Sequence, residues 1–209
     1  MNASMVRFGG IAVFAGIALG IILPFLLAGS GVGRFILSLI QTAIILFVLW
    51  TTKGFMNAKG YKKADIPLLI VMAVTLLLFV VGLIFSTQAG LGTIMSGRMA
   101  AAGLIGIVIL IVSLLMLGSW LWFAFLAIGF GKSGGGIWKA IGILYLVAFG
   151  LFLVIAIIGA LAGGSGSAAA MGGAAIGGGI LALIGLLVFL GAVICHGIGL
   201  ILGAGKMGT

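Results

Sequence analysis

Long apolar segments in this chain are separated by short cationic stretches, and the most cationic stretch constrains the fold most strongly. Residues 53–65 contain Lys53, Lys59, Lys62, Lys63 and Asp65, the only acidic residue of the chain. A lysine at the centre of a bilayer costs roughly 2.5–3.5 kcal/mol on insertion scales, so this stretch must lie at a membrane surface. Because cytoplasmic loops carry an excess of Lys and Arg, we expect it to face the cytoplasm and to contact anionic lipid headgroups.

The composition supports this interpretation. Of the 209 residues, 65% are hydrophobic and 5% are charged, whereas a soluble domain usually carries about 25% charged residues. The formal charge of +9 is dispersed over the ends of apolar segments instead of lying beside aromatic residues on one face, which argues against nucleic-acid binding. We therefore predict an all-α integral membrane protein, multi-pass, in a cytoplasmic membrane of the prokaryotic type.

Six apolar segments are long enough to cross a bilayer as helices, for which about 20 residues suffice. We predict one polytopic membrane domain over residues 1–209, a six-helix bundle with helices at about 9–28, 34–52, 66–86, 102–122, 139–162 and 176–203. The segment Ala124 to Trp138 is predicted to be either an interfacial segment or a kinked extension of the fourth helix. The segment 163–175, which consists of Gly, Ser, Ala and one Met, is predicted to be a flexible outer linker.

The distribution of Lys and Arg predicts the topology. Six crossings place both termini on one side of the membrane, and only Arg34 and Arg98 then flank outer helix ends. The other cationic residues flank inner ends: Arg7, Lys53, Lys59, Lys62, Lys63, Lys132, Lys139 and Lys206. Both termini are therefore predicted to be cytoplasmic. Lys59, Lys132 and Lys206 recur at intervals of 73 and 74 residues, which is compatible with three helical hairpins as a repeating unit.

Small residues recur four positions apart on two predicted helices. The first helix has Ala12, Gly16 and Gly20, and the sixth has Gly191, Cys195, Gly199 and Gly203. Such stripes let a second helix approach closely and gain dispersion contacts and weak Cα–H···O bonds. They predict packing either between helices of this chain or with a partner, which would be another membrane subunit or a second copy.

Few polar side chains lie within the predicted helices. Thr75, Tyr145 and His196 are predicted to lie at a similar depth near the inner surface and to form one polar cluster. One interpretation of His196 is a ligand of haem, a pigment or a metal, and the other is a packing histidine that is hydrogen-bonded. Arg34, Ser38 and Gln41 share one face of the second helix, which either lines an outer vestibule or bonds to an adjacent helix.

These residues do not support catalysis. The chain has one acidic residue, one His and one Cys, and therefore lacks a carboxylate pair or a nucleophile with a convincing base. No cofactor is predicted. We expect a non-enzymatic structural or accessory subunit that packs into a larger membrane assembly. One alternative is a channel or carrier for a small neutral solute, and a weaker one is a cofactor-holding subunit through His196.

Overall fold

A computed structural model describes residues 2–27, 31–87, 99–165 and 168–207. In these ranges the chain forms the helices α1 (Ala3–Leu27), α2 (Gly31–Ala58), α3 (Asp65–Thr87), α5 (Met99–Gly134), α6 (Gly136–Ser165) and α7 (Ala168–Gly205), with a short 3-10 helix η1 (Lys62–Ala64) before α3. Within these described residues, six helices contain a segment long and apolar enough to cross a membrane. The prediction of a multi-pass helical bundle with six spanning helices is confirmed.

Several helices extend beyond their predicted ends. α5 continues without interruption to Gly134, and Gly135, with φ of 102°, reverses the chain into α6. Residues 124–134 thus continue the α5 helix and belong to its candidate membrane span, Leu114–Gly134. α6 continues to Ser165 and α7 begins at Ala168, so most of the predicted linker 163–175 is helical. In lipid a glycine-rich backbone keeps its internal hydrogen bonds because no water is available to replace them. The predicted outer loop with Arg98 falls largely outside the described residues.

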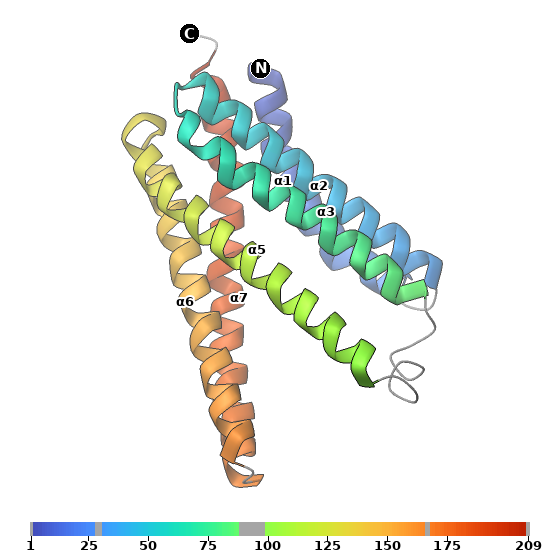
Figure 1. Ribbon diagram of the computed structural model, residues 1–209. Coiled ribbons are helices and arrows are strands. Elements are labelled where there is room, and N and C mark those ends of the chain that lie inside the picture. The colour runs from blue at the N-terminus through green and yellow to red at the C-terminus, as the bar shows by residue number, and fades with distance from the viewer. Residues whose placement is uncertain (1, 28–30, 88–98, 166–167, 208–209) are drawn as a thin grey trace.

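The helices form two arms that diverge from one end of the molecule (Figure 1). α1, α2 and α3 make up the first arm, and α6 and α7 make up the second. α5 packs against both α6 and α3, and α1 packs along α7 and joins the arms. The helices are therefore grouped in two unequal arms linked by α5, and the pairs α1–α2, α3–α5 and α6–α7 each pack against one another, as three helical hairpins would. We call the end where the arms meet the closed end and the opposite end the open end.

The start of α1 and the end of α7 lie at the closed end, together with η1 and the turn between α5 and α6 (Figure 1). The cationic residues predicted to share one side lie in these elements or within five residues of the adjoining helix ends. Two of the recurring lysines even meet there, because Lys59 Nζ donates a hydrogen bond of 3.1 Å to the backbone carbonyl of Lys206. The arrangement thus places the cationic groups at one end, and the assignment of that end to the cytoplasm stays a prediction.

The arms are held together by a close crossing of α1 and α7. A Cβ atom added to Gly10 would lie 2.6 Å from the backbone oxygen of Gly197, and one added to Gly197 would lie 3.2 Å from the backbone oxygen of Gly10. Separations this short leave no room for side chains, so the two backbones approach each other only because both residues are glycines.

The predicted small-residue stripes pack mainly within the chain. Gly16 and Gly20 face α2, where the nearest atoms belong to Ile44 and Gln41. Gly199 faces Ile141 and Trp138 of α6, and Gly203 faces Phe55 of α2. Ala12 and Cys195 are half-buried. Only Gly191 has open space around it, with no atom within 4 Å of an added Cβ.

An aromatic core fills the closed end. Phe55, Phe130 and Trp138 are fully buried and contact one another, with ring centroids 5.3 to 5.7 Å apart. They come from α2, α5 and α6, so this core links both arms. Such large rings bury much apolar surface, and their edge-to-face and stacked contacts stabilise the closed end.

Candidate binding site

His196 lies beside this core and connects two hydroxyl groups from other helices. Its Nε2 atom is 2.8 Å from Thr52 Oγ1, and its Nδ1 atom is 3.3 Å from the Tyr145 hydroxyl. The Thr52 hydroxyl donates to the Val48 carbonyl at 2.7 Å. It therefore accepts a hydrogen bond from Nε2–H, which leaves Nδ1 to accept one from Tyr145. Both imidazole nitrogens thus have partners within the chain.

The structure brings together Tyr145 and His196 of the predicted polar cluster, but not Thr75. The Thr75 hydroxyl instead donates to the Val71 carbonyl of its own helix at 2.7 Å. Thr52 takes the third position because α2, rather than α3, supplies the side chain next to His196. A sequence signal for Thr52 existed: two consecutive threonines directly precede Lys53, at the inner end of an apolar segment.

Aromatic rings surround the imidazole. Phe123 is stacked on His196 with a centroid distance of 5.8 Å, and Trp138 meets it edge-on at 5.4 Å. His196 is 2% exposed. A haem or metal ligand at this position would have to break one of the two hydrogen bonds of the ring, so the geometry gives no support to the cofactor interpretation of His196.

A cavity of about 610 Å³ lies between the arms next to this polar cluster. All six long helices contribute to its lining, which consists of Val13, Gly16, Ile17, Gln41, Ile44, Ile45, Val48, Leu49, Leu78, Met116, Leu117, Trp120, Tyr145, Phe149, Phe189, Val193 and His196. None of these lining residues is charged. The volume falls in the range of roughly 300–1,000 Å³ that holds a drug-sized molecule.

Besides Trp120, whose indole N–H forms no hydrogen bond with the described residues, Gln41 is the polar residue of the cavity wall that has no partner. It is half-buried, and its side chain forms no hydrogen bond with any residue that the structure describes. The amide nitrogen lies 3.5 Å from the position of a Cβ on Gly20. Of the predicted polar face on α2, Gln41 lines the cavity and Ser38 is exposed. The Arg34 side chain lies outside the described residues.

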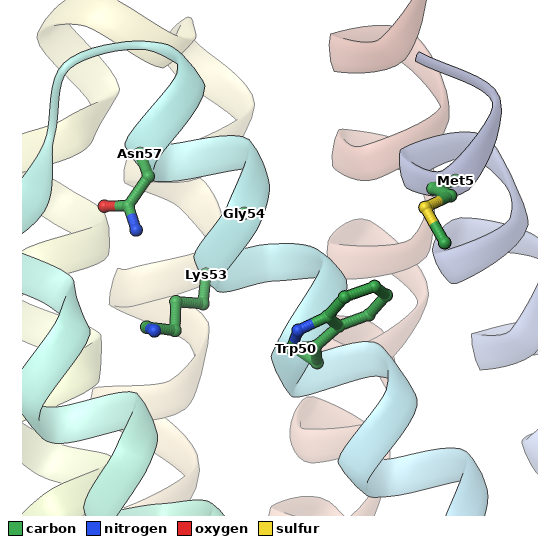
Figure 2. A pocket seen from close by; sticks show the side chains of 5 residues that line it. All are labelled: Met5, Trp50, Lys53, Gly54 and Asn57. Atoms are coloured by element: carbon green, nitrogen blue, oxygen red, sulfur yellow. The ribbon is translucent and has the colours of Figure 1, made fainter. Parts of the chain in front are cut away.

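A second, smaller cavity of about 250 Å³ lies at the closed end, lined by Met5, Trp50, Lys53, Gly54 and Asn57. Figure 2 shows the Trp50 ring extending toward Met5, while Lys53 and Asn57 point to the other side of α2. There Lys53 Nζ lies 3.7 Å from Asp65 Oδ1, and Asn57 Nδ2 donates to the same oxygen at 2.8 Å. Trp50 and Lys53 suit a helix end at the membrane interface.

Comparisons of this chain with protein-family models, with curated protein sequences and with solved structures found no match. The fold and the site define a class: a multi-pass helical membrane protein with an uncharged cavity between two arms.

Proposed function

We propose that this chain is a non-catalytic membrane protein that binds a small neutral molecule in the cavity between its arms, as a carrier for such a molecule would. The supporting observation is the cavity of about 610 Å³, to which every spanning helix contributes and whose described lining is uncharged. A charged ligand would be left without a partner there, at a cost of several kcal/mol. The geometry therefore favours a binding function over a purely structural role or a cofactor-holding role.

Filling the cavity tests this function. In Val193→Trp the indole enters the cavity, whereas in Leu187→Trp, on the same helix, it replaces a side chain that is 60% exposed. The probe is a long-chain alkane bearing a diazirine, and labelled peptides are mapped by mass spectrometry in lipid nanodiscs. We expect labelling of cavity residues to fall at least tenfold in Val193→Trp and to persist in Leu187→Trp. Equal labelling in both variants, confined to lipid-facing residues, would exclude the proposal.

A structural or accessory role is the second candidate, and one observation favours it. Gly177, Gly178, Gly179 and Gly191 of α7 have no atom within 4 Å of an added Cβ. A helix of another subunit, or of a second copy, would fit closely on such a surface. Native mass spectrometry of protein extracted in mild detergent tests this role. A partner that is lost in Gly178→Leu would support it, and a monomer without any partner would count against it.

We propose further that the closed end faces the cytoplasm of a prokaryotic-type cell and contacts anionic lipids there. The support is the concentration of Lys and Arg in the elements of that end. Single cysteines at Ser4 and Lys206, introduced with Cys195→Ala, should both resist a membrane-impermeant maleimide in intact cells and react after lysis. Reaction of either position in intact cells would reverse the orientation.

A further inference from the structure

Gln41 indicates which neutral molecules the cavity selects. Resting on the proposed function, we infer that the ligand is a single-chain neutral amphiphile whose hydroxyl or carbonyl group hydrogen-bonds to the Gln41 amide. Lipid tails are as apolar as the cavity wall, so an apolar chain such as the alkane probe enters the cavity wherever space is open but gains no selectivity over the bilayer. Selection must therefore come from shape and from the few polar groups in the wall.

Because Gln41 lies far from both ends of its helix, an amide without a hydrogen-bond partner at this position is energetically unfavourable. Gln41 is 10 residues from the start of α2 and 17 from its end, which places it about 15 Å and about 25 Å from the two helix ends. At such a depth water is scarce, and an amide without a partner costs roughly 1–3 kcal/mol. The amide supplies two N–H donors and one carbonyl acceptor. A ligand with a hydroxyl, ester or amide group would satisfy them.

Two other polar residues of the wall are already engaged, and a third, Trp120, offers only the N–H donor of its indole. The Tyr145 hydroxyl donates to His196 Nδ1, and the Nε2–H of His196 is directed at Thr52. Gln41 is thus the lining residue that offers free donors together with a free acceptor among the described residues, because the indole of Trp120 can only donate. It marks the place of the ligand's polar group.

The shape of the cavity favours a ligand with a single hydrocarbon chain. From Gln41 to Leu49 the cavity follows α2 for about 12 Å, judged by the helical rise per residue. The α2 residues between these two that line it are Ile44, Ile45 and Val48. A volume of about 610 Å³ suits a molecule of drug size rather than a two-chain phospholipid. The absence of charge from the described lining excludes a fatty-acid carboxylate or a phosphate headgroup.

Two probes of equal length test this inference: a long-chain alcohol bearing a diazirine, and the matching alkane without the hydroxyl group. Gln41→Leu removes the amide and keeps a side chain of similar size. We expect it to weaken labelling of the cavity by the alcohol about tenfold, which corresponds to about 1.4 kcal/mol, and to leave labelling by the alkane unchanged. Ser38→Ala, at an exposed position on the same helix, should leave labelling by both probes unchanged.

The outcomes separate this inference from the function on which it rests. If both probes label the cavity and Gln41→Leu affects neither, recognition through Gln41 is wrong and the binding function stands. If neither probe labels the cavity of the unmodified protein, the binding function itself fails. Gln41→Met, which is unbranched like Gln, replaces Gln41→Leu if that variant does not fold.

Discussion

The closed and open ends of the bundle are built from similar residues but pack differently. At the closed end Gly10, Gly197 and Gly203 contact atoms of other helices, whereas Gly178 and Gly191, farther from the closed end along α7, have no atom within 4 Å of an added Cβ. Large rings such as Phe55 and Trp138 lie beside the closed-end glycines. A glycine in a membrane helix therefore becomes a packing site only where a large side chain or a second backbone occupies the space that it leaves.

The largest loss of stability is expected from adding a methyl group to a closely packed glycine, compared with adding one to a glycine that has open space around it. In Gly10→Ala the new Cβ would lie 2.6 Å from the Gly197 oxygen, which forces α1 and α7 apart. Overpacking of this kind costs about 1–3 kcal/mol, and we expect about 2 kcal/mol of lost stability. Thermal unfolding in detergent measures it as a lower midpoint.

Gly191→Ala is the matched control. Its Cβ meets open space, and alanine is the better helix former by up to about 1 kcal/mol. The midpoint should stay unchanged or rise. Equal destabilisation by both substitutions would show that the closed end does not depend on its backbone crossing.

A smaller loss of stability is expected when the hydrogen bond between Tyr145 and His196 is removed. Tyr145→Phe removes the donor to Nδ1 and leaves that nitrogen buried without a partner. An unsatisfied buried acceptor costs roughly 1–3 kcal/mol, and because this bond is 3.3 Å long we expect about 1 kcal/mol. The free energy of unfolding in detergent, from denaturant titration, measures the loss.

Tyr61→Phe provides the comparison for this prediction. Tyr61 is half-buried at the closed end, and its hydroxyl forms no hydrogen bond with the described residues. Its substitution should change the stability by less than about 0.5 kcal/mol. If the two variants lose equal stability, the hydroxyl of Tyr145 contributes nothing through His196.

The helices could be predicted from the sequence, but their ends could not. Apolar segments between cationic positions indicate spanning helices because charges avoid hydrocarbon. The rule that glycine and serine mark linkers, which holds in water, misplaced the start of α7. In lipid the glycine-rich segment from Ala168 onward stays helical because the backbone has no water to bond with.

The candidate site was predictable only in part. Depth along the helices paired Tyr145 with His196, but it cannot tell which neighbouring helix lies beside the pair, and so Thr52 was missed. The four-residue spacing of small residues likewise did not indicate the contact of Gly10 with Gly197. Local spacing does not show where two helices that are distant in the sequence cross. The cavity results from the divergence of the arms and leaves no sequence pattern, although its wall residue Gln41 was singled out as polar.

The smallest effects are expected at the charged surface of the closed end. Lys62 and Lys63 are exposed, and the only acidic residue, Asp65, is already paired with Lys53 at 3.7 Å. A lysine near an anionic membrane surface contributes about 1 kcal/mol at low salt. Replacing both Lys62 and Lys63 with Gln should therefore reduce the enrichment of anionic lipid around the protein in mixed nanodiscs.

Lys53→Gln should leave that enrichment nearly unchanged, because its ammonium group is directed at Asp65 and not at the lipid. The difference between the two variants should disappear near 1 M salt, where the screening length falls to about 3 Å. A loss that persists at high salt would mean that the lysines act through specific contacts. Equal losses in the two variants would mean that the pairing of Lys53 with Asp65 does not persist in the membrane, as expected if such exposed pairs contribute little.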